Sequence, residues 1–265
     1  IDLFVRFYNS PHHKISDILE KILPVRFKRV HGSRDYFLYK KGSVLIEVIP
    51  ILKINTPQEA ENVTDLSYFH VNYILHKIKQ QESLRNEIIL LKHFCYIHHC
   101  YGAESYIKGF SGYALELLMC HYGSVLSFMK AITALDDSEK IIIDDSGFYK
   151  NKEDLLTHLN EAKQQSQIIL IDPTNKNRNA LSGLSPETFH RFKTTVRQFL
   201  TKPHKNFFVM KNITDEFKDK NVRVLIVKTL KQSGDIAGTK SKKFFDFFLR
   251  KLGEEFLVKK SGFDY

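Results

Sequence analysis

Two carboxylates set within apolar runs are the residues of this sequence best suited to metal chemistry. Glu47 lies in the middle of SVLIEVIPILKI (residues 43–54), and Asp2 precedes a second apolar run over residues 3–7. Side chains on a strand alternate between its faces, so Glu47 would share a face with apolar neighbours, where an unpaired carboxylate is costly. Two interpretations stay open: a solvent-facing edge position, or a ligand that shares a divalent cation with Asp2 if the two strands are neighbours. Carboxylate oxygens of this kind suit Mg²⁺.

A second group of metal-ligating residue types is CYIHHC, residues 95–100. On one helix, its two cysteines and two histidines would point over more than half of the circumference. Four ligands so close in sequence cannot surround one zinc ion tetrahedrally, so the pattern disfavours a zinc site.

Two further segments could bind anions. In residues 109–124, glycines flank an expected helix start at Ser111, where backbone amides could hold an anion or the helix could simply pack closely on a neighbour. In residues 171–179, a strand ends at Asp172 and an expected polar loop carries Arg178. A basic loop after a strand suits phosphate or base recognition, with ordinary surface charge as the alternative.

The elements expected to position these residues fall into three parts, which predict an α+β multidomain protein. Residues 1–78 alternate between strand and helix periodicity and indicate a small α/β sheet. Residues 79–204 are mainly helical, and residues 205–265 indicate an incomplete α+β unit. The expected helices lie at 15–23, through Asn72, from Glu82, from Ser111, from Ser185 with Pro186 in its first turn, and at 240–256; the later strands lie at 141–145, 167–173, 222–230 and from 261.

Composition points to a nucleic-acid partner. The 265 residues carry a net charge of +10, and residues 202–265 hold 15 Lys and Arg against 8 Asp and Glu, or +7. A basic, aromatic-rich end suits phosphate contact, although a merely soluble basic surface is the alternative.

Three irregularly spaced cysteines do not form a disulfide framework, and no signal peptide or long apolar span occurs, so we expect a cytoplasmic protein with no membrane partner.

The ordered motifs together resemble a known family. IDLFV, IEVIP, YFHVNYI, LLKHF, YGAESYIKGFSGYALELLMCHYGS and IDPTNKNRNALSGLSPETFHRF follow the order and approximate spacing of the archaeal-type, class I CCA-adding tRNA nucleotidyltransferases. The resemblance covers nearly the whole chain and is strongest over residues 87–192. The family belongs to the polymerase-β-like nucleotidyltransferases.

This resemblance implies a domain organisation. Residues 1–78 look like part of the catalytic head, residues 79–204 like the central or neck domain, and residues 205–265 like the start of the body that grips the tRNA acceptor stem. The family's first catalytic acid, its Gly-Ser phosphate-binding motif and its C-terminal tail are not in the sequence. We therefore expect the 265-residue chain to be an inactive fragment.

The resemblance also assigns catalytic roles. Asp2 matches the second catalytic carboxylate and Glu47 the third, and with the absent first acid they would bind two Mg²⁺ ions. One ion would lower the pKa of the RNA 3′-hydroxyl, and the other would neutralise the triphosphate as pyrophosphate leaves. The family has Asp where this sequence has Glu47, which leaves the efficiency of the chemistry open.

Five positions match nucleotide contacts of the family. Ser67 matches a position near the ribose, where Thr is common, and Arg178 matches the residue that reads the base edge. Asp172 would orient the loop that carries Arg178. The other three match triphosphate contacts, although a core histidine, a solvated helix lysine and a packed aromatic are the alternatives: His70, Lys92 and Tyr101.

The implied activity is template-independent addition or repair of the 3′-terminal CCA of tRNA from CTP and ATP. A polyadenylating or oligoadenylate-type nucleotidyltransferase would keep the same head chemistry, and a non-catalytic RNA-binding relative would keep only the basic surface. The partners implied are tRNA, the two nucleotides and, as an alternative to a monomer, a second copy of the chain.

Overall fold

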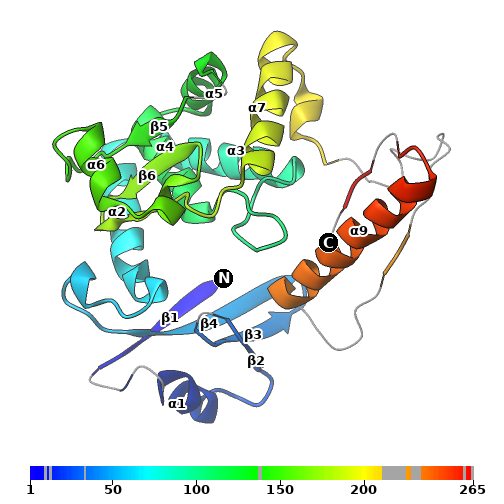
Figure 1. The fold of residues 1–265 in the computed structure, drawn as a ribbon. Helices are drawn as coiled ribbons and strands as arrows, with labels where there is room; N and C mark the ends of the chain where they lie inside the picture. Colours follow the sequence, from blue (N-terminus) through cyan, green and yellow to red (C-terminus); the bar gives the residue numbers. More distant parts are fainter. Residues whose placement is uncertain are drawn as a thin grey trace. The chain divides into compact units, whose positions relative to one another are not determined.

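The computed structural model divides the chain into two compact units (Figure 1). It describes residues 1–8, 11, 14–32, 34–136, 139–210, 225–227, 234–258 and 261–263. Unit 1 comprises residues 1–82 and 172–177, and unit 2 comprises residues 83–171 and 178–265. The mixture of helices with two small sheets confirms the predicted α+β class.

Unit 1 is built on a four-stranded sheet of order β1-β4-β3-β2. The strand β1 (Asp2–Phe7) runs parallel to β4 (Val44–Leu52), and β3 (Tyr36–Lys41) pairs antiparallel with both β4 and β2 (Lys28–Val30). The turn between β3 and β4 contains Gly42, whose φ of +60° is a conformation that glycine adopts without steric cost. The strands expected on either side of this turn are confirmed.

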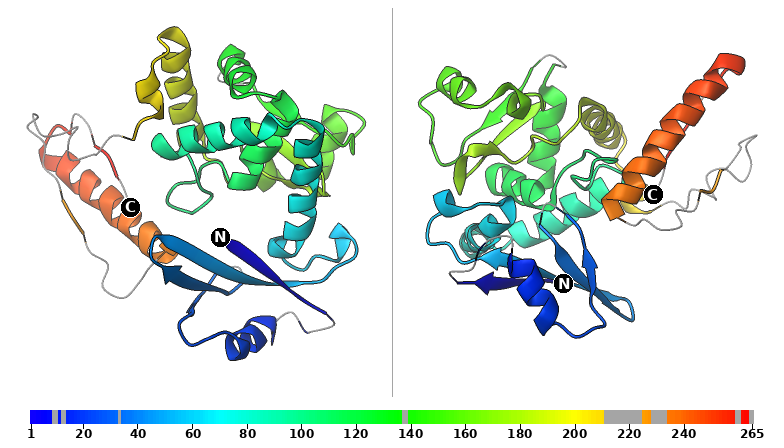
Figure 2. Two further views of the ribbon diagram at one scale, coloured as in Figure 1. Left: turned by 180° about the vertical axis from the view of Figure 1, so that it is seen from behind. Right: turned by 60° about the horizontal axis from the view of Figure 1, so that its bottom comes forward.

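One face of the sheet is covered by helix α1 (Ile15–Ile22), as both views of Figure 2 show. Leu19 of α1 packs in a buried cluster with Phe37 and Val48. Alternate residues of a strand face opposite sides, and Glu47 is the neighbour of Val48 in β4, so Glu47 belongs to the face opposite α1.

A buried ion pair connects the sheet to the segment before α2 (Ser67–Gln80). Arg34 contacts both carboxylate oxygens of Asp65, and the Nη2 to Oδ2 distance is 2.9 Å. The Arg34 and Asp65 side chains are only 2% and 0% exposed. Burial by itself would raise the pKa of Asp65, but hydrogen bonds from Arg34 and from the Leu52 and Asn62 amides hold it below its usual value. The same carboxylate therefore fixes the end of β4 and the short helix η3 (Val63–Leu66) that leads into α2.

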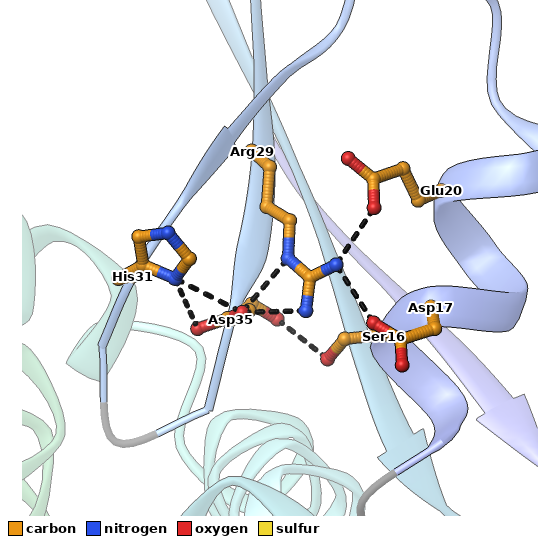
Figure 3. Close-up of polar contacts among 6 residues, drawn as sticks. All are labelled: Ser16, Asp17, Glu20, Arg29, His31 and Asp35. Carbon is orange, nitrogen blue, oxygen red and sulfur yellow. Dashed lines mark hydrogen bonds and ion pairs between the residues drawn. The ribbon is translucent and has the colours of Figure 1, made fainter.

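A more exposed polar network joins α1 to β2 (Figure 3). Arg29 Nη1 donates to Asp17 at 2.8 Å and to Glu20 at 2.7 Å, and its Nε donates to Asp35 at 2.8 Å. These three acids raise the pKa of Arg29. Burial would raise the pKa of Asp35, yet Arg29 and His31 lower it.

Unit 2 is mainly helical around an aromatic core. Phe94, Phe110, Phe128 and Phe192 are all 0% exposed, and Phe110 and Phe192 have ring centroids 4.9 Å apart. Serine side chains cap three of the helices by accepting a hydrogen bond from the first turn, as predicted for Ser111 and Ser185. The surrounding helices are α3 (Leu84–Ile97), α4 (Gly112–Tyr122), α5 (Val125–Ala134) and α7 (Pro186–Thr201).

A three-stranded sheet of order β5-β6-β7 includes β5 (Ile141–Ile143), β6 (Ile168–Asp172) and β7 (Asn175–Asn179). Helix α6 (Lys152–His158) packs beside it through Leu155. The prediction of a polar loop that follows the strand and carries Arg178 was wrong, because β7 follows β6 after a two-residue turn. Its polar sequence NKNRN lacks the apolar alternation by which strands are recognised.

The last described elements are the short helix η5 (Lys205–Phe208) and the long helix α9 (Gly234–Glu255). The helix expected at 240–256 is confirmed, although it begins earlier, at Gly234. Of the strand expected at 222–230, only residues 225–227 are described, and they form no regular element. Residues 261–263 form no strand either, and the remainder of both segments lies outside the described residues.

None of the described helices is by itself both long and apolar enough to cross a bilayer. Only α4 and α5 taken together reach that length and composition, across a 91° bend.

Candidate functional site

Asp2 and Glu47 are direct partners across the parallel strands β1 and β4. Paired residues project to the same face of a sheet, so both carboxylates lie on the face that α1 leaves uncovered. Asp2 is exposed and Glu47 is partly buried. Burial and the nearby charge of Asp2 raise the pKa of Glu47. The two strands are neighbours, which was the condition for a shared cation, and Glu47 is neither a fully solvated edge residue nor an isolated buried charge.

This pair fits a hard divalent cation. Its donors are carboxylate oxygens, and burial and the charge of Asp2, which both raise the pKa of Glu47, are costs that a bound cation would offset. In the part of the chain that the structure describes, no group of three or more His, Cys, Asp or Glu side chains is arranged to hold a metal ion. Two carboxylates with substrate phosphates are sufficient for Mg²⁺, which commonly keeps few protein ligands.

The CYIHHC segment does not form a metal centre. Cys95 and Cys100 are 0% exposed, and burial raises the pKa of both thiols, to about 12 for Cys100. The imidazole of His98 instead meets the main-chain carbonyl of Phe207 at 2.9 Å. Cys95 and Cys100 thus lie in the packed end of α3 and the turn that follows it.

Helix α2 presents Ser67 and His70, which lie three positions apart and therefore on one side of the helix. His70 Nε2 lies 3.0 Å from Asp172 Oδ2, and the two side chains are 12% and 0% exposed. The other oxygen of Asp172 accepts from the backbone N–H and the hydroxyl of Thr174, each at 2.8 Å. An ionised carboxylate only accepts, so the Asp172 contact fixes Nε2 of His70 as the protonated nitrogen. Asp172 thus orients the turn, as expected, and also orients His70.

In unit 2, Lys92 and Tyr101 meet at the first turn of α4. A Cβ added to Gly112 would lie 2.9 Å from the Tyr101 hydroxyl and 3.7 Å from Lys92 Nζ, so both groups adjoin this glycine. Lys92 Nζ also contacts Glu116 Oε1 at 2.5 Å. The amide groups at a helix N-terminus carry partial positive charge, so an ammonium and a hydroxyl beside them form surroundings that favour an anion.

An open hollow of about 220 Å³ adjoins this cluster. It is lined by Lys92, His93, Tyr96 and Tyr101. Lys92 is partly buried and ion-paired, so it is not the fully solvated helix residue that was the alternative.

Arg178 lies on β7, and its guanidinium carbon is 5.7 Å from the ring centroid of Tyr113 in α4. The next residue, Asn179, is 2% exposed and accepts from the Leu170 and Leu181 amides at 3.0 and 2.9 Å. Its amide nitrogen donates to the Lys163 carbonyl at 2.8 Å. The backbone directly after Arg178 is therefore held in place by the side chain of Asn179.

Sequence reasoning missed three partners of the candidate residues: Asp172 for His70, Glu116 for Lys92 and Tyr113 for Arg178. His70 and Asp172 are 102 positions apart, and no local pattern connects them. Tyr113 and Glu116 stand three apart in α4, which was an available but weak signal that both face the same side.

Comparisons with known proteins support the family resemblance that the sequence motifs indicated. Residues 86–209 match the family model of the tRNA nucleotidyltransferase second domain. The CCA-adding enzyme of Nanoarchaeum equitans is 40% identical over 193 residues, which cover 71% of this chain and 48% of that protein. The CCA-adding enzyme of Methanocaldococcus jannaschii is 33% identical over 218 residues, covering 78% and 47%. The chain thus spans about half the length of the curated relatives it matches.

One solved structure gives a fold comparison. A cytoplasmic RNA terminal U-transferase superposes with a TM-score of 0.55 at 12% identity, over 80% of this chain and 82% of that one. At this identity the likeness concerns the fold alone.

Proposed function

Because the chain belongs to the family of archaeal-type CCA-adding tRNA nucleotidyltransferases, we propose that its protein adds or repairs the 3′-terminal CCA of tRNA, using CTP and ATP and releasing pyrophosphate. The observation that supports this most directly is the in-register pair Asp2 and Glu47 on adjacent parallel strands. Paired carboxylates on one face of a sheet are what metal-assisted nucleotidyl transfer requires.

Asp2 and Glu47 would hold Mg²⁺ and, through it, the triphosphate. The bound ions would lower the pKa of the RNA 3′-hydroxyl and offset the charge that develops on the leaving pyrophosphate. The contribution of the protein is to hold both carboxylates on one face of the sheet, which the shared register of β1 and β4 supports.

Five residues are proposed to contact the nucleotide. Lys92 and Tyr101 would bind phosphate oxygens, and Lys92 would then exchange Glu116 for phosphate. His70, oriented by Asp172, would act on the triphosphate through an N–H. Ser67 would lie near the ribose, and Arg178 would read the base edge, since a planar guanidinium donates in a fixed geometry.

Residues 205–265 are proposed to contact the tRNA acceptor stem. Support comes from α9, where exposed aromatic rings are interspersed with cations: Lys240, Lys242, Lys243, Phe244, Phe247, Phe248, Arg250 and Lys251. Such a surface gives affinity that falls steeply with salt. A cytoplasmic location is part of the same proposal.

The test uses the full-length gene product. It is incubated with tRNA lacking CCA, Mg²⁺ and labelled CTP or ATP, and the RNA 3′ ends are sequenced. We expect C, C and then A, with no further addition. Asp2→Ala and Glu47→Ala should each lower the rate roughly a hundredfold or more. Glu61→Ala, which removes an exposed acid of the same unit, is the matched control and should leave the rate unchanged.

Other outcomes select the alternatives. Runs of A alone would indicate a polyadenylating relative. Tight tRNA binding without any addition, unaffected by Asp2→Ala or Glu47→Ala, would indicate a non-catalytic RNA-binding protein. Glu47→Asp restores the side chain usual in the family and should keep activity at or above the wild-type rate.

A further inference from the structure

We propose that Tyr113 is a positioning residue for nucleotide selection, because its ring holds the Arg178 guanidinium in the orientation that reads the base. This inference rests on the proposed function and adds to it a residue outside the contacts assigned above. It concerns unit 2 alone, in which both side chains lie.

The geometry of the pair is the first argument. The guanidinium carbon of Arg178 lies 5.7 Å from the centroid of the Tyr113 ring, within the range at which a cation is attracted to an aromatic face. An arginine side chain has several rotatable bonds, and a base-reading guanidinium must present its donors in one plane. An aromatic face restricts the guanidinium more than solvent does.

The rigidity of both attachment points is the second argument. On the Arg178 side, Asn179 fixes the end of β7 by hydrogen bonds to three separate backbone groups. On the Tyr113 side, the Ser111 hydroxyl caps α4 by accepting from the Ala114 amide at 3.2 Å, and Ala114 is 0% exposed. The ring and the guanidinium therefore meet across two anchored backbones, so their contact is reproducible.

The neighbour of Tyr113 is the third argument. Gly112 precedes it in the same helical turn and adjoins Lys92 and Tyr101, the proposed phosphate contacts. The first turn of α4 thus supports a phosphate-binding pair through one residue and a base-reading arginine through the next. Such an arrangement fixes the distance between the phosphate and base contacts of a single nucleotide within unit 2.

The experiment compares Tyr113→Leu and Tyr113→Phe in the full-length gene product. For each, kcat and KM are measured for CTP against UTP at the C positions and for ATP against GTP at the A position. Tyr113→Phe keeps the aromatic face and should keep wild-type selectivity. Tyr113→Leu should lower selectivity about 2- to 10-fold, with a smaller change in the rate of correct addition.

The second arm asks whether Tyr113 acts through Arg178. In the Arg178→Ala background, where selectivity is already reduced, Tyr113→Leu should cause no further loss, since coupled residues are non-additive. A merely structural role would instead lower the melting temperature and slow all four nucleotides equally, and would add to Arg178→Ala. Tyr113→Met replaces Tyr113→Leu if the leucine variant shows no cooperative unfolding.

The outcomes separate the two proposals. Wild-type selectivity in an active Tyr113→Leu variant, or full additivity with Arg178→Ala, overturns the inference and leaves the proposed function intact. A wild-type protein that adds neither C nor A overturns the proposed function and this inference with it.

Discussion

Unit 1 buries an arginine against a carboxylate, whereas unit 2 buries a lysine against a main-chain carbonyl. In unit 1, Arg34 and Asp65 are almost fully enclosed and contact each other through both carboxylate oxygens. In unit 2, Lys193 of α7 is 1% exposed and donates to the Leu135 carbonyl at the end of α5, at 2.7 Å. Acid can neutralise the carboxylate of Asp65, so this buried pair adds a pH dependence to the stability of unit 1.

The strongest test of this contrast removes one partner of the buried pair. Asp65→Ala leaves the Arg34 guanidinium buried without its carboxylate and should destabilise unit 1 by about 3–5 kcal/mol. Hydrogen exchange measured by mass spectrometry should show faster exchange in β1, β3 and β4, with little change in α5 and α7. Asp17→Ala, in an exposed ion pair, is the control and should cost about 0–1 kcal/mol. Equal effects of the two variants would contradict the assigned role of the buried pair.

Acid should act on the same pair, with a smaller effect than its deletion. Since the folded-state pKa of Asp65 is lowered, its contribution is complete above the unfolded pKa of about 3.9 and is lost as pH falls through the lower folded value. Pepsin, which is active in acid, should therefore cleave within residues 14–66 before it cleaves the helices of unit 2. Asp65→Asn should weaken this pH dependence, and cleavage that starts in α7 would contradict the contrast.

The corresponding change in unit 2 is Lys193→Met. It removes the donor to the Leu135 carbonyl and should cost about 1–3 kcal/mol, because a buried acceptor loses its partner. We expect faster hydrogen exchange at the end of α5. Lys202→Met, an exposed position just after α7, should leave exchange unchanged.

The smallest effect is expected for the network with the most charges. Arg29→Ala breaks contacts to Asp17, Glu20 and Asp35, yet these are partly exposed and should contribute only about 1 kcal/mol in total. Thermal unfolding at low and high salt provides the measurement, since added salt should reduce the difference from wild type. A difference that high salt does not alter would mean that Arg29 acts by packing instead.

The sequence predicted what depends on local pattern. The apolar run around Glu47 and the helix caps at Ser111 and Ser185 followed from residue type and spacing. The pairing of β1 with β4 did not, and it entered only as a condition for a shared cation. The sequence did not predict β7, because residues 175–179 are polar and show no alternation.

Contacts between distant segments were also missed. The pairing of His70 with Asp172 and of Lys92 with Glu116 depends on which helices and strands pack together. Tertiary packing decides these contacts, and a single sequence gives no periodic signal for them.

The buried thiols of α3 and its following turn allow the opening of unit 2 to be measured by the rate of thiol alkylation. All three cysteines lie among the described residues without a disulfide, and Cys95 and Cys100 are enclosed, whereas Cys120 is partly accessible. Alkylating reagents attack the thiolate, so burial and a raised pKa should protect the first two in the native state. A maleimide should modify Cys120 promptly and the other two only when α3 detaches from the aromatic core. The lag between the first adduct and the second would then report how often unit 2 opens.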